Sequence, residues 1–181
     1  MTISDTQWEV RTTYMGGFVG QLVSATLWLV SCALTAWASR RAGIVAFVVG
    51  GMFIFPVTQL VLRWMGRTAS LSLGNPFREL AVEVAFLVPL LLPLVGAAAI
   101  HRAEWFYPAA AVVVGAHYLP FAFLYGMRLF LPLSGILVAT GLGIGLWKPA
   151  DGLLAGWLAA ATMIVFAFLG RRSVTGARRA N

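Results

Sequence analysis

The sequence contains few charged residues and a single cysteine. Of its 181 residues, 10% are charged and 60% are hydrophobic, and the mean hydropathy is +0.87. Soluble domains carry roughly a quarter charged residues, so this composition excludes an ordinary soluble domain. A lone cysteine, Cys32, excludes an intramolecular disulfide and any metal site built from several cysteines.

The motifs of several common enzyme classes are also missing. The chain has no phosphate-binding loop, no His-Glu-x-x-His segment and no Gly-x-Ser-x-Gly segment. Its two histidines, His101 and His117, fall at different depths of the apolar sequence and make a poor metal site. We therefore expect no metal and no cofactor, and we favour a protein that is not an enzyme.

Long apolar runs dominate what is present. A membrane-spanning helix needs about 20 residues, and six runs come near that length. The sequence thus predicts an all-α bundle of six transmembrane helices over residues 16–170, after a cytoplasmic or interfacial segment at 1–15 and before a basic cytoplasmic tail at 171–181. The first run ends in a sequence like a signal-peptidase site, but its length and the absence of a preceding basic excess favour retention. The runs are 16–38, 43–62, 80–100, 105–125, 129–147 and 152–170.

The basic residues predict the orientation of the bundle. With six spans, nine Lys and Arg residues lie on the side of the two termini and four lie on the other side. The positive-inside rule then places both termini in the cytoplasm. Because the arginines sit at the ends of apolar runs, the net charge of +7 indicates anionic lipid headgroups, and not nucleic acid, as the partner. The arginines expected at the headgroups are Arg63, Arg67, Arg171 and Arg172.

Prolines and small residues predict how the helices bend and pack. Four prolines fall inside the runs, where each removes a backbone donor and tends to bend its helix. Small residues four apart, as in Gly16-x-x-x-Gly20 and Gly141-x-x-x-Gly145, allow close helix contact. This contact can lie within the bundle or between the copies of a homo-oligomer, and the sequence does not separate the two. The four prolines are Pro56, Pro89, Pro93 and Pro120.

Two apolar segments 64 residues apart suggest an internal repeat. Residues 48–56 and 112–120 both contain a Val-Val-Gly stretch and end in proline. A duplication would relate helices 1–2 and 3–4 as parallel hairpins, as in some transporter folds. Chance similarity between apolar segments is the alternative.

Three short motifs carry a resemblance to a known family. They are Met-Phe-x-Phe-Pro at 52–56, Asn-Pro at 75–76 and Gly-Ala-His-Tyr-x-Pro-Phe at 115–121, followed by Tyr125. Together they resemble an uncharacterised family of small bacterial multipass membrane proteins, catalogued as a domain of unknown function. The resemblance covers roughly residues 15–147. It implies a bacterial inner-membrane protein and implies no activity.

Ionisable groups inside a bilayer cost free energy and are candidates for function. His117 lies about 12 residues into the fourth run, near the expected midplane, with Tyr118 beside it. The alternative for His117 is a structural histidine bonded to a carbonyl that a proline has freed. Glu83 is a candidate cation or proton site, and the alternative is a carboxylate paired with a nearby arginine. The residues expected to form a polar layer below His117 are Gln21, Gln59, Glu83, Tyr125 and Arg128.

The function that these features favour is a small channel or transporter for a small solute or an ion, with a pathway past His117. Bent spans and polar residues near the midplane support this hypothesis. Two alternatives remain. One is a structural or partner-binding membrane subunit, and the other is a lipid-binding protein or enzyme with His117 as its acid–base group.

Overall fold

A computed structural model gives the fold of the chain. It describes residues 2–179, and the side chains of residues 2–174; within these residues all regular structure is helical. The last two residues of the expected tail, 180 and 181, lie outside the described part. Helical structure continues through residue 179, so the tail expected from residue 171 begins as an extension of the last helix. The elements are α1 (Ile3–Thr13), η1 (Met15–Gly17), α2 (Phe18–Trp37), α3 (Arg40–Trp64), α4 (Phe77–His101), η2 (Ala103–Trp105), α5 (Phe106–Tyr118), α6 (Phe121–Leu124), α7 (Phe130–Trp147), η3 (Pro149–Asp151) and α8 (Gly152–Arg179).

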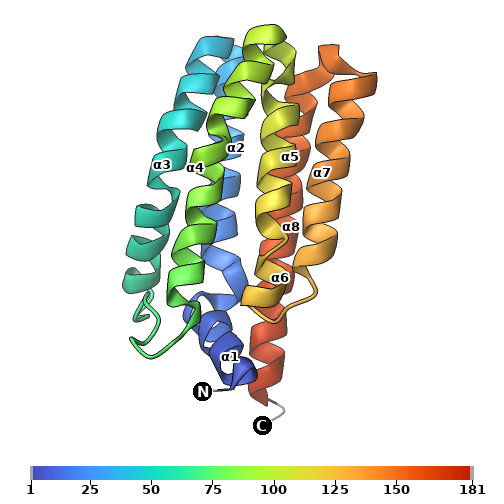
Figure 1. Cartoon of the computed structure of the whole chain (residues 1–181). Coiled ribbons are helices and arrows are strands. Elements are labelled where there is room, and N and C mark those ends of the chain that lie inside the picture. The colour runs from blue at the N-terminus through green and yellow to red at the C-terminus, as the bar shows by residue number, and fades with distance from the viewer. Residues whose placement is uncertain (1, 180–181) are drawn as a thin grey trace.

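Six segments within residues 2–179 are long and apolar enough to cross a membrane. This confirms the six predicted spans, and we conclude that the chain is a multipass helical membrane protein. Both termini lie at one end of the bundle, which we call the terminal end; the opposite end is the far end (Figure 1). The six spans are Met15–Trp37, Arg40–Trp64, Phe77–His101, Ala103–Leu124, Phe130–Trp147 and Pro149–Val174.

The six long helices form two layers of three. Helix α2 packs between α3 and α8, and α5 packs between α4 and α7, while α8 also contacts α5 and α7. Helices α3 and α4 touch each other only sparsely. Only 6% of the most apolar stretch of α3 and 11% of that of α4 is buried inside the protein, whereas 50% of that of the α2 span is buried. The protein core therefore lies among α2, α5, α7 and α8.

Glycines bring the core helices close together. The backbones of Gly16 and Gly170 meet where η1 crosses α8, and Gly141 of α7 lies against Pro108 of α5. Gly156 of α8 leaves room for Cys32. A side chain at any of these positions would overlap its neighbour. The small-residue faces are thus used for packing inside the chain, and a homo-oligomer through such faces stays a prediction.

The four prolines differ in their effect. Helices α3 and α4 continue through Pro56, Pro89 and Pro93. Pro120 divides the fourth span instead: α5 ends at Tyr118, and the four-residue helix α6 follows. Pro120 thus interrupts the fourth span, where a proline was expected to bend the helix, because it lacks the N–H that the next helical hydrogen bond requires.

Candidate functional site

The inner face of α2 carries a row of polar side chains through most of the bundle. Gln21, Ser24, Ser31 and Thr35 follow a spacing of three, seven and four residues, which places them on one face of the helix. Trp28 occupies the same face between the two serines. All five side chains are buried or partly buried. We call the four polar residues the α2 polar stripe.

Toward the far end, the stripe joins a network of hydroxyl groups. The Tyr107 hydroxyl of α5 donates to the Ser31 carbonyl at 3.0 Å and lies 2.8 Å from the Ser31 hydroxyl. It also lies 2.6 Å from the Thr35 hydroxyl. The Ser31 hydroxyl donates to the carbonyl of Gly43 at 2.9 Å. The network therefore ties α2, α3 and α5 together with groups that are all paired.

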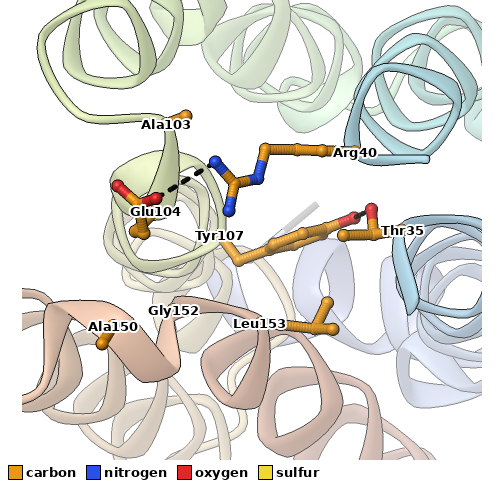
Figure 2. Close-up of a pocket in the computed structure, with 8 residues that line it drawn as sticks. All are labelled: Thr35, Arg40, Ala103, Glu104, Tyr107, Ala150, Gly152 and Leu153. Carbon is orange, nitrogen blue, oxygen red and sulfur yellow. Dashed lines mark hydrogen bonds and ion pairs between the residues drawn. The ribbon is translucent and has the colours of Figure 1, made fainter.

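A cavity of about 410 Å³ opens above this network at the far end. Its polar lining consists of Thr35, Arg40, Glu104 and Tyr107, and Leu153 stands on the apolar side (Figure 2). Arg40 donates to the Glu104 carboxylate at 3.1 Å. Pockets that hold small molecules fall in this range of volume. The cavity thus has the size and the mixed chemistry of a small-molecule site.

An aromatic cluster closes the bundle on the terminal side of the cavity. The Trp28 and Phe47 rings meet edge to face with centroids 4.8 Å apart, and Phe47 meets Phe106 in the same way at 5.4 Å. Trp28 lies 6.3 Å from the Tyr107 ring. These contacts place bulky side chains between the cavity and the terminal half of the stripe.

Several buried polar atoms in the terminal half have no hydrogen-bond partner among the described residues. They are the Gln21 side-chain oxygen, the Thr58 hydroxyl and Nδ1 of His117. Gln21 is 2% exposed and Thr58 is 9% exposed. A buried polar group left unpaired costs about 1–3 kcal/mol. These atoms are therefore candidates to bind a polar molecule.

The structure places His117 near the middle of the bundle. It is the penultimate residue of α5, two residues after Gly115, which packs against the middle of α7 at Leu137. The His117 ring contacts Phe121 at 4.8 Å and Tyr118 at 5.7 Å between centroids, and it interacts with the backbone of Val84. The surroundings are thus aromatic and backbone groups. This resembles the structural alternative for His117, except that Nδ1 is unpaired.

The predicted polar layer is brought together only in part. Tyr14 links two of its members: its hydroxyl interacts with the Gln59 side chain, and its ring lies 6.5 Å from that of Tyr125. Tyr118 packs within the same aromatic group and donates to the sulfur of Met163. Glu83 and Arg128 are exposed, and neither side chain forms a hydrogen bond or ion pair with another described residue.

Helix α1 lies across the terminal end and binds two loops (Figure 1). Gln7 donates to the carbonyl of Phe123 at 2.6 Å, and Arg11 donates to the carbonyls of Tyr125 and Gly126 at 3.0 and 2.7 Å. On the other side, Glu9 accepts from the backbone and the hydroxyl of Ser72 and from the Asn75 amide. The hydrogen bond from the Ser72 backbone, supported by those side chains, lowers the pKa of Glu9. We call Gln7, Glu9 and Arg11 the α1 latch.

One of these features can be seen in the sequence once the helices are known, and another cannot. The α2 polar stripe is visible as polar residues on one face of the first run, but its members are spaced among many apolar residues. The cavity cannot be seen, because Arg40, Glu104 and Leu153 come from three separate segments. Among the described residues no group of three His, Cys, Asp or Glu side chains is placed to hold a metal ion.

Comparison with known proteins gives a family and no activity. No curated protein matches the chain. No solved structure matches it either. A family model described as a family of unknown function, DUF7010, matches residues 3–172, which is most of the chain. The chain is thus a multipass helical membrane protein that belongs to this family of unknown function.

Proposed function

We propose that the protein is a transporter for a small polar solute, in a bacterial inner membrane with the terminal end in the cytoplasm. The solute binds first in the far-end cavity and then follows the α2 polar stripe. The observation that carries the proposal is the Gln21 amide, which is buried on this stripe with its oxygen unpaired. A solute or water that passes along α2 supplies the missing partner.

The arrangement favours a transporter over an open channel. The cavity is open at the far end, whereas Trp28 and Phe47 close the bundle below it and the α1 latch ties the loops at the terminal end. A solute in the cavity therefore has to wait for a rearrangement before it proceeds. His117 stays a predicted pathway residue. Like the Gln21 oxygen and the Thr58 hydroxyl, its Nδ1 has no partner among the described residues and can bind a passing polar group.

The test is uptake of small polar solutes by liposomes that contain the full-length protein. The panel is urea, glycerol, a monosaccharide and a neutral amino acid, and at least one should enter faster than in protein-free vesicles. Gln21→Leu should lower that uptake several-fold. The same substitution removes an unpaired buried oxygen, so it should leave the stability unchanged or raise it by about 1 kcal/mol.

Thr26→Val is the matched control. Thr26 also lies on α2, but it is exposed and its hydroxyl donates to the carbonyl of Leu22. This variant should transport like the wild type. The proposal would be wrong if liposomes with the protein took up the solutes no faster than protein-free liposomes. It would also be wrong if the Gln21→Leu protein transported normally.

A second candidate is a partner-binding membrane subunit, and the uncovered faces of α3 and α4 favour it. Large side chains such as Met52, Phe53 and Phe55 are exposed along α3. In a Cys32→Ala background, Phe53→Cys should form disulfide-linked dimers in membranes if α3 meets a second copy. Absence of such dimers would mean that the exposed face of α3 contacts lipid or another protein, and not a second copy of this chain.

A further inference from the structure

The far-end cavity presents groups of both charges to the same space. The Arg40 and Glu104 side chains meet at 3.1 Å, yet they keep 49% and 38% of their surface exposed, so a bound molecule can reach both (Figure 2). We propose that the cavity binds a small zwitterion that carries an ammonium and a carboxylate group. The inference rests on the proposed function and names the substrate class of the same cavity.

The hydroxyl network decides what Thr35 offers to a ligand. The Thr35 hydroxyl lies 2.6 Å from the Tyr107 hydroxyl, and either oxygen can be the donor. A hydroxyl has one proton and two lone pairs, so Thr35 keeps at least one lone pair for a ligand in both cases. Thr35 therefore faces the cavity as a hydrogen-bond acceptor.

The cavity thus has a donor and two acceptors for one ligand. The Arg40 guanidinium binds a carboxylate, with geometry that favours two parallel hydrogen bonds. The Glu104 carboxylate accepts from an ammonium group, and the Thr35 oxygen is a second acceptor on the other side of the cavity. Leu153 and Ala150 on the opposite side suit an apolar substituent. A zwitterion replaces the internal ion pair with two charge-assisted contacts.

A ligand with one charge does not fit equally well. An anion that binds Arg40 separates the guanidinium from Glu104 and leaves that carboxylate without its cation. A cation that binds Glu104 leaves Arg40 unpaired in the same way. Because the zwitterion makes two charge-assisted contacts where either ion makes one, it is preferred over both.

The experiment measures binding by the full-length protein in detergent, without transport. The probes are L-leucine, L-leucinamide, which lacks the carboxylate, and 2-hydroxy-4-methylpentanoate, which lacks the ammonium. The three have nearly the same shape. Leucine should bind about ten-fold more tightly than either, as expected for loss of one charge-assisted contact.

Two substitutions should invert this preference. In Arg40→Gln the carboxylate loses its partner, so leucinamide should bind at least as well as leucine. In Glu104→Gln the ammonium loses its partner, so the hydroxy acid should bind at least as well as leucine. A variant that is merely misfolded would lose all three probes together and could not produce opposite selectivities.

The neighbouring arginine supplies the matched control. Arg41 is exposed and does not line the cavity, so Arg41→Gln makes the same change of charge and should bind leucine like the wild type. Equal binding of the three probes, tighter binding of either ion, or no binding of leucine at millimolar concentration would overturn the zwitterion site. Leucine binding without uptake in liposomes would keep this site and remove transport, whereas uptake of another solute without leucine binding would do the reverse.

Discussion

The two ends of the bundle are held together by different means. Glycines bring helices into close contact at both ends, and at the far end a paired hydroxyl network also sits beneath an open cavity. At the terminal end, the α1 latch lies over the bundle and binds two loops through charged and amide side chains. Packing at the far end is difficult to change without unfolding. Hydrogen bonds at the terminal end can break and form again, which makes that end the one suited to open.

The largest expected effect comes from a substitution that breaks the far end. Gly43 of α3 lies against α2, where a side chain would overlap the Thr35 hydroxyl and the Ser31 carbonyl. Gly43→Leu should push α3 away from α2 and lower the free energy of unfolding by about 3 kcal/mol, as overpacking does. Thermal unfolding in detergent measures the loss.

Gly51→Leu is the control on the same helix. A side chain at Gly51 meets no atom within 4 Å, so this variant should unfold near the wild-type temperature. Equal losses for the two variants would mean that α3 is not held against α2 as described here.

The second expected effect is local and concerns the terminal end. Arg11→Gln removes the donors to Tyr125 and Gly126, and Glu9→Gln weakens the hydrogen bonds from Ser72 and Asn75. Hydrogen bonds that involve one charged group contribute about 1–2 kcal/mol, so exchange of the released loop should speed up about ten-fold. Arg11→Gln should expose residues 119–129 and Glu9→Gln residues 65–76, as seen by hydrogen–deuterium exchange.

Global unfolding should change little in both latch variants, in contrast to Gly43→Leu. Glu79→Gln serves as the control, because Glu79 is exposed and forms no hydrogen bond or ion pair with the residues that the structure describes. Simultaneous loosening of both loops in either variant would show that the latch acts as one unit and not as two separate contacts.

The six spans could be predicted from the sequence, whereas the contacts of the terminal end could not. Apolar run lengths predicted all six spans, because a helix in lipid must be apolar along its whole length. The N-terminal segment, which is predicted to be cytoplasmic or interfacial, begins with a capping box of Thr2 and Asp5, and its contacts depend on loops more than 60 residues away. Local patterns specify a helix, whereas no local pattern specifies which distant carbonyl Arg11 binds.

The candidate site was predicted less well than the fold, for a similar reason. An isolated histidine stands out in an apolar run, so His117 was predicted to be a site residue. The cavity instead uses Thr35 of α2, Arg40 of α3 and Glu104 of η2. Each is ordinary in its own segment, and only the fold brings the three segments together. Glu83 and Arg128 were predicted from depth alone, and both side chains are exposed, Glu83 on α4 and Arg128 in the turn before α7.

A third expected effect is a dependence of the latch on pH. Hydrogen bonds to its carboxylate hold the pKa of Glu9 below its ordinary value of 4.5, so the folded protein favours the ionised form. The stabilisation is present above pH 4.5 and is lost as the pH falls through the lowered pKa. Limited proteolysis of residues 65–76 should therefore accelerate only below about pH 4.5.

Glu9→Gln separates this effect from other acid effects near α1. The pKa of Asp5 is also lowered, by its hydrogen bonds with Thr2, and acid therefore weakens the start of the helix as well. Cleavage in Glu9→Gln should be faster at neutral pH and nearly independent of pH in this range. If acid accelerates cleavage in Glu9→Gln as much as in the wild type, the acid effect belongs to Asp5 and not to Glu9.

The smallest effect on stability is expected from the ion pair of the far end. Arg40 and Glu104 are both about half exposed, and pairs of this kind contribute little because water screens them and the side chains lose freedom. Glu104→Gln and Arg40→Gln should thus leave the unfolding temperature close to that of the wild type, and the double variant should show no coupling. A clear loss of stability in either single variant would make the pair a structural clamp between α3 and η2. Stable variants with altered ligand selectivity would instead show that the charges are kept at the far end for binding, while those of the terminal end hold the fold closed.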